Sequence, residues 1–177
     1  EDPDVRVEWV GWEGRPPGHP FAGYSEEEKR EKYEKAHKPL ADKYGVPIRV
    51  AGADYRTTNA HIATYYARAM GRFKEFRDRV YRARWVEDLD LESPDVLARL
   101  GEEVGLDGDG VQRVIAEKRY LAVLHSQRAQ GKGLGIRGIP SFVVQGKIFW
   151  SVDPIDDVKA AVARVKEERL RQEAQDG

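Results

Sequence analysis

A glycine-rich stretch from Gly131 to Gly146 constrains the fold of this chain more than any other feature. It contains five glycines and separates a region of helical spacing from two runs of β-branched and aromatic residues. The runs are Ser141–Val144 and Lys147–Trp150, and Gln145-Gly146 between them suits a tight turn. Two such runs joined by two turn residues predict an antiparallel β-hairpin.

Helical spacing dominates the sequence before this hairpin. Ser25 and Glu28 fit a capping box for a helix that runs to about Tyr44, with Gly45 as its stop and Pro39 as a point where it kinks or splits. Further helices are predicted over about 59–71, 73–86, 94–104 and 111–131, and a last one begins near Asp153, Asp156 or Asp157 and dissolves into a charged tail. The helices outnumber the strands by far.

The first residues have a different pattern. Residues 5–10 alternate apolar with polar side chains, which predicts a strand with one buried face. A loop with aromatic anchors follows, over residues 11–23. The predicted order is therefore strand, helical block, hairpin and helix, which indicates an α/β protein.

Charge and histidine spacing exclude several kinds of site. There are 30 Lys and Arg against 31 Asp and Glu, a formal net charge of −1, so no overall field favours nucleic acid or an anionic membrane. The four histidines never come within four residues of one another, so no local metal pair exists. They are His19, His37, His61 and His125. We predict no metal, no nucleic-acid partner and no membrane partner.

The chain contains no cysteine. This excludes a disulfide framework, a Cys-ligated zinc and a Cys nucleophile within these residues. There is no apolar run of about 20 residues and no secretion signal at the first residues, so we expect a cytoplasmic location. The chain also lacks an initiator Met and opens almost directly into a strand-like run, and we expect that a segment precedes it.

Several segments resemble a known family. The run from Gly135 through Ile139-Pro140 to Val144, with its turn and second strand, is similar to the cis-proline segment of thioredoxin-fold proteins. Taken alone, Ile-Pro also fits a trans proline that opens an edge strand. The helical block between strand and hairpin, especially residues 81–107, resembles the insertion of the DsbA-like branch. Phe149-Trp150-Ser151-Val152-Asp153 is similar to the F-W-G-x-D signature of 2-hydroxychromene-2-carboxylate isomerases and kappa-class glutathione transferases.

The resemblance implies a thioredoxin-like fold with an inserted all-helical subdomain. Residues 1–24 and 132–177 would form the thioredoxin-like portion, and residues 25–131 the helical insertion with its connecting segments. The family's first strand and helix, which carry a CxxC pair or a Ser nucleophile, would be missing, because the chain begins where the second strand is expected. Residues 5–10 would then lie about 10 Å from the hairpin, with a strand slot between them.

The resemblance also implies three alternative functions. The first is a DsbA-like thiol–disulfide oxidoreductase domain that binds a peptide or thiol substrate beside a cis-proline. The second is a glutathione-dependent isomerase or transferase, in which the thiolate of bound glutathione does the chemistry. The third is a non-catalytic binding domain with the same groove. An uncovered strand edge invites association, so a homodimer is one assembly to expect.

Six residues are predicted to bind substrate, and no catalytic residue is identified. Ile139 and Pro140 form the ledge for an extended ligand. Asp153 would accept a hydrogen bond from the amino group of glutathione, or else cap the last helix. Trp150 would stack on ligand or pack in the core. The predicted groove is lined by Trp12, His61 and Ile139.

Overall fold

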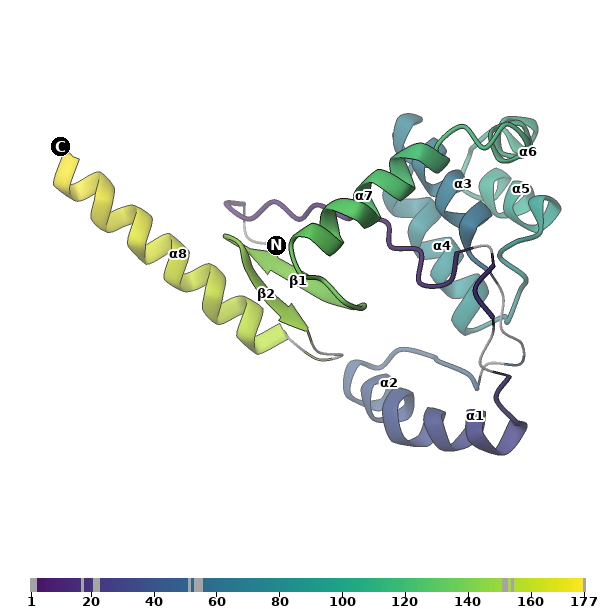
Figure 1. The fold of residues 1–177 in the computed structure, drawn as a ribbon, viewed down its shortest axis with the longest axis horizontal. Helices are drawn as coiled ribbons and strands as arrows, with labels where there is room; N and C mark the ends of the chain where they lie inside the picture. Colours follow the sequence, from purple (N-terminus) through teal and green to yellow (C-terminus); the bar gives the residue numbers. More distant parts are fainter. Residues whose placement is uncertain are drawn as a thin grey trace. The chain divides into compact units, whose positions relative to one another are not determined.

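The computed structural model describes residues 3–16, 18–20, 23–50, 52, 56–150, 153 and 155–176. The chain divides into two compact units, residues 1–14 with 127–177 and residues 15–126. Each unit is treated by itself. Figure 1 shows the elements in chain order: α1 (Glu26–Lys32), the π-helix η1 (Tyr33–His37), α2 (Lys38–Tyr44), α3 (Thr58–Ala69), α4 (Phe73–Trp85), α5 (Pro94–Glu102), α6 (Gly108–Ala116), α7 (Leu121–Gly133), β1 (Ser141–Val144), β2 (Lys147–Trp150) and α8 (Ile155–Asp176).

The core of the helical unit lies among α3, α4, α5 and α6. Its fully buried members come from one face of each helix, as the amphipathic spacing predicts. They include Ile62, Phe76, Leu97, Leu100, Val111 and Val114. Helices α5 and α6 approach closely at Gly101, where an added Cβ would lie 3.0 Å from Cγ2 of Val111. Helices α3 to α6 therefore form a packed body with its own core. The bounds predicted for the helical insertion, residues 25–131, stay a prediction.

Local signals placed most helix starts correctly. Ser25 and Glu28 form the predicted capping box, and Ser93 accepts a hydrogen bond from the N–H of Val96. The helix that contains Pro39 is interrupted, as expected, by η1, in which the N–H of Lys38 donates to the carbonyl of Tyr33. Proline has no N–H to donate to the carbonyl four residues earlier, so the helix adopts the wider hydrogen-bond pattern just before it.

The prediction of one helix over 111–131 is wrong. The structure has α6 and α7 with a turn at residues 117–120. Lys118 adopts a left-handed conformation with φ 50°, and Arg119 donates its N–H to the carbonyl of Val114. This pattern satisfies the last carbonyls of a helix and ends it. No glycine marks the break, so no local signal in the sequence predicts it.

The hairpin is confirmed in the register that its turn dictates. Ser141 pairs with Trp150 and Val144 with Lys147, while Gln145 and Gly146 have φ of 45° and 76°. Two positive φ values suit the turn type that matches strand twist. Helix α8 lies beside β1 (Figure 1). It does not dissolve into a tail but continues to Asp176, with charged pairs four residues apart such as Arg169 with Glu173.

The predicted strand over residues 5–10 is not formed. In the described part of the chain the sheet holds β1 and β2 alone, and residues 5–10 pair with neither strand. Val7 is 69% exposed, so alternation did not bury one face. The physical reason is that a strand requires a partner for its ladder hydrogen bonds, and the hairpin does not supply one here.

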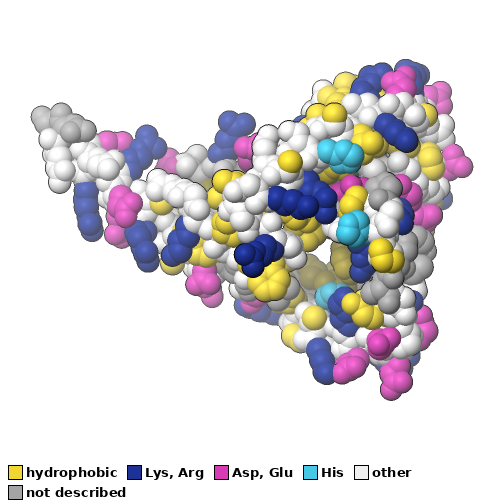
Figure 2. Space-filling model, in the orientation of Figure 1, with side chains coloured by type: hydrophobic (Ala, Val, Ile, Leu, Met, Phe, Trp, Pro, Cys, Tyr) yellow, Lys and Arg dark blue, Asp and Glu magenta, His cyan; other side chains and the backbone are white. Residues whose placement is uncertain are grey.

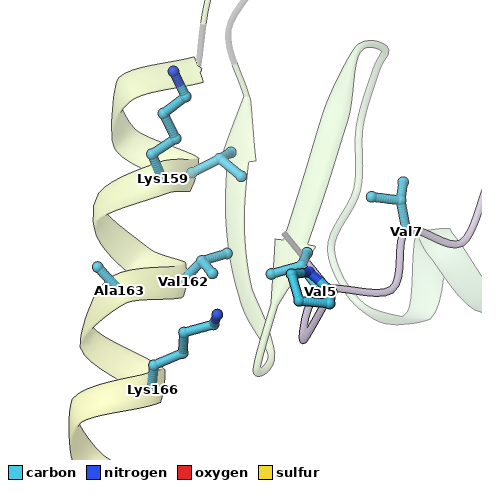
Figure 3. A pocket seen from close by; sticks show the side chains of 8 residues that line it. Val5, Val7, Lys159, Val162, Ala163 and Lys166 are labelled. Atoms are coloured by element: carbon cyan, nitrogen blue, oxygen red, sulfur yellow. The ribbon is translucent and has the colours of Figure 1, made fainter. Parts of the chain in front are cut away.

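Residues 3–7 instead border a groove along α8. Its volume is ≈ 880 Å³. Its walls are Pro3, Val5 and Val7 on one side and Val158, Lys159, Val162, Ala163 and Lys166 of α8 on the other. In Figure 3, Val162 points from α8 toward Val5, and Lys166 pairs with Asp4 at 2.9 Å. The apolar side chains of the expected strand thus line a groove opposite a helix face and form no sheet.

Charges of both signs intermingle on the surface. Figure 2 shows Lys and Arg side chains alternating with Asp and Glu over α8 and over the helical unit. Many are paired, as Arg79 is with Glu87 and Glu103. The hydrogen bond from Arg79 lowers the pKa of Glu103 below its ordinary value.

None of the helices as described is long and apolar enough to cross a membrane.

The titration of one half-buried histidine, His37, gives a test of the helical unit. The His37 ring lies edge-on to Trp85, with centroids 5.5 Å apart. Burial, and secondarily the charge of Lys32, lower the pKa of His37 below its usual 6.5. The unfolded chain therefore binds this proton more tightly, and the stability contributed by neutral His37 is lost as the pH falls from about 6.5 through the folded-state pKa.

We expect the free energy of unfolding to fall more steeply between about pH 7 and about pH 5 in the parent than in His37→Phe. Phenylalanine keeps a ring against Trp85 and removes the titrating group, while all carboxylates titrate equally in both proteins. Urea denaturation at several pH values measures the difference. Equal pH slopes would show that His37 has no shifted pKa.

Candidate functional site

The segment before β1 presents a bare backbone and an exposed apolar side chain. The Ile139–Pro140 peptide bond is cis, the isomer that the motif predicts. Ser141 donates its hydroxyl to the carbonyl of Gly138 at 2.6 Å, which closes a tight turn around the proline. Ile139 is 58% exposed, and it precedes Ser141, the first residue paired in the hairpin. Its backbone therefore lies outside the hairpin ladder.

Trp150 lies next to this segment. It ends β2 opposite Ser141 and is 70% exposed, so the alternative of core packing is wrong. A Cβ added to Gly138 would lie 3.2 Å from its Nε1, which places the indole directly over the backbone of that glycine. The structure thus brings Trp150 together with the segment of Ile139 and Pro140, and an indole beside a bare backbone forms a flat, partly apolar shelf.

Trp12 is held on a different element, the C-terminal half of α7. A Cβ on Gly131 would lie 2.8 Å from Cζ3 of its ring, closer than real side chains come, so the indole packs on bare helix backbone. Gly11 donates its N–H to Oε1 of Gln127 at 3.1 Å and fixes the approach of this segment. The Cζ atom of Arg128 lies 5.8 Å from the centre of the Trp12 ring, a cation–π contact.

Three polar residues around Trp12 were missed from the sequence. Glu13 has no exposed surface, Arg128 is half-buried with a buried Nε, and Gln127 anchors Gly11. In the sequence, Glu13 is an ordinary carboxylate in a predicted loop. Gln127 and Arg128 lie within a predicted helix, and nothing in the pattern indicates which face of that helix they occupy. The one available signal was Gly131, because a glycine inside a helix indicates a close packing partner.

The remaining predicted residues are Asp153 and His61. Asp153 is half-buried and lies just before α8, which suits both a capping role and a ligand role, and it takes part in interactions of its own. Ser151, which replaces the family's glycine, lies outside the described residues. His61 is half-buried near the start of α3, in the helical unit. A groove that joins His61 to Trp12 and Ile139 stays a prediction.

No group of three potential metal ligands forms among the residues that the structure describes. Asn59, near the start of α3, donates its N–H to the carboxylate of Glu92 at 3.1 Å. Glu92 lies in the loop before α5 and therefore helps to cap α3. The site's chemistry therefore rests on an exposed backbone, two indoles, a guanidinium and a carboxylate. These groups bind and orient a ligand, and none is a strong nucleophile.

The contact between Trp12 and Gly131 can be tested with a matched pair of variants. Gly131→Ala should displace the Trp12 ring and lower the free energy of unfolding by about 1–3 kcal/mol. Gly133→Ala, two residues later in the same helix, meets nothing within 4 Å and should be neutral or stabilising by up to about 1 kcal/mol. Chemical denaturation followed by tryptophan fluorescence measures both. Equal effects at the two positions would contradict the close packing.

Comparisons with known proteins show the family of this chain. A family model for the DSBA-like thioredoxin domain matches residues 12–163. The chain is 28% identical over 145 residues to the uncharacterized protein YwbO of Bacillus subtilis, covering 80% of this chain and 72% of that protein. It is also 28% identical over 116 residues to 2-hydroxychromene-2-carboxylate isomerase of Sphingobium xenophagum. That match covers 66% of this chain and 59% of the isomerase.

Solved structures show the same fold. A structure of 2-hydroxychromene-2-carboxylate isomerase superposes with a TM-score of 0.70 at 19% identity, covering 85% of this chain and 75% of that one. A "probable DsbA oxidoreductase" from Streptomyces coelicolor gives 0.71 at 22% identity, covering 82% and 64%. The family match spans the segment of Trp12, both helical and hairpin regions, and the start of α8. The chain therefore belongs to the DSBA-like thioredoxin domain family.

Proposed function

We propose that this domain binds a thiol compound in extended form along the segment before β1, and that the compound is glutathione, as in a glutathione-dependent isomerase or transferase. One observation carries the proposal: the backbone of Gly138 and Ile139 lies outside the hairpin ladder, and the exposed indole of Trp150 lies against Gly138. An extended ligand can pair with such a backbone as one more strand. The indole contributes apolar contact along the same shelf.

The choice of glutathione rests on the source of the sulfur. The 177 residues contain no cysteine, so none of them supplies a thiol. In the proposed complex the reactive thiol is that of the bound ligand. Asp153 follows β2 closely and is half-buried, and its carboxylate is suited to accept a hydrogen bond from the ligand's amino group. The similarity to an isomerase of this family supports the same choice.

Calorimetric titration with glutathione tests the proposal. We expect saturable binding by the parent and about tenfold weaker binding by Trp150→Ala, since a large exposed aromatic at the shelf loses its contact with the ligand. Leu170→Ala removes a comparably exposed apolar side chain from α8 and should bind as the parent does. Absence of binding by the parent, or equal loss in the two variants, would overturn the proposal.

A second candidate is binding of a peptide substrate by a DsbA-like thiol–disulfide oxidoreductase. Its support is the exposed apolar surface of Ile139, Val143 and Trp150, which suits side chains of an extended peptide. In that reaction a dithiol supplied from outside these residues would exchange with the substrate disulfide. An apolar, cysteine-containing peptide that binds when glutathione does not would favour this candidate. Binding of the peptide without redox turnover would favour a non-catalytic binding domain.

A further inference from the structure

The half-buried arginine on α7, Arg128, differs from two other sheltered arginines that the structure describes. Arg79 and Arg84 are similarly sheltered, and each pairs with carboxylates. Arg128 has no salt bridge and no hydrogen bond to any residue that the structure describes, and its Nε is buried without a partner. Its described contact is the face of Trp12. The buried Nε–H of Arg128 therefore lacks the acceptor that a buried donor requires.

The surroundings hold this guanidinium in place. Trp12 packs against the bare backbone of Gly131, one helical turn after Arg128, so the ring that supports the guanidinium is itself fixed. The N–H of Gly11 on Gln127 fixes the neighbouring backbone. The Nε of Arg128 is buried, so its two Nη groups are the part of the fork that a planar anion can reach. Carboxylates match that fork with two parallel hydrogen bonds.

We propose that Arg128, whose guanidinium lies over the Trp12 ring, is a binding residue for a carboxylate of the thiol ligand. The assignment rests on the proposed function: glutathione carries two carboxylates, and its proposed shelf lies in the same unit of the protein as Arg128. Helix α7 leads through residues 134–138 into the segment of Ile139 and Pro140, and Ile136 donates its N–H to the carbonyl of Gly131. The site of Trp12 and Arg128 is thus joined to the shelf of Ile139, Pro140 and Trp150 by one short, hydrogen-bonded stretch of chain.

The test compares glutathione with glutathione diethyl ester, in which both carboxylates are blocked, by calorimetry on the full chain. The parent should bind the diester about 10- to 100-fold more weakly than glutathione. Arg128→Gln should bind glutathione about as weakly as the parent binds the diester, and it should bind the diester as the parent does. Arg128→Lys should keep part of the affinity, because it keeps the charge without the fork. Arg164→Gln, at an exposed position of α8, is the matched control.

The outcomes separate the two proposals. If the parent binds glutathione and Arg128→Gln binds it equally well, the Arg128 assignment is wrong and the proposed function stands. If the parent binds neither compound, the proposed function fails and this inference fails with it. The comparison of glutathione with its diester on the parent needs no variant, so it decides the role of a carboxylate even if Arg128→Gln unfolds. Equal affinity for the two compounds would overturn the inference.

Discussion

The packing of the Trp12 ring against the bare backbone of α7 is the contact on which the site depends. An indole can reach a helix backbone only where a side chain is missing, and Gly131 provides that place. The contact ties the N-terminal segment to the end of α7, where the chain turns toward the hairpin. It also gives Arg128 an aromatic face to rest on. The glycine at position 131 thus positions the Trp12 ring, and through it the guanidinium of Arg128, next to the chain segment that leads to Ile139 and Pro140.

The sheet is small, so the unit of residues 1–14 and 127–177 depends on contacts outside the sheet. A two-stranded hairpin is only marginally stable in water, and here α8 covers part of it. Residues 5–10 have the pattern of a strand but do not pair, so Val5 and Val7 meet α8 across a groove instead. Their apolar surface is only partly removed from water. The larger apolar core lies in the helical unit, among α3 to α6.

The two candidate ligands make different demands on the same surface. A short acidic thiol compound needs a cation for its carboxylate and an acceptor for its amino group, and Arg128 and Asp153 have those chemistries. An apolar peptide needs a continuous apolar strip, which Ile139, Val143 and Trp150 offer. Both would use the backbone before β1, because main-chain pairing does not depend on side-chain identity. The side chains around that backbone therefore determine specificity.

The sequence by itself determined the elements whose signals are local. The capping box at Ser25, the N-cap at Ser93 and the hairpin turn at Gln145-Gly146 all act over a few residues, and all were predicted. The family resemblance was readable for the same reason, since its motifs are short. Only the tertiary structure decided that residues 5–10 form no strand and that Trp150 is exposed. Strand pairing and burial depend on partners distant in sequence, and a period-2 pattern cannot show whether a partner is present.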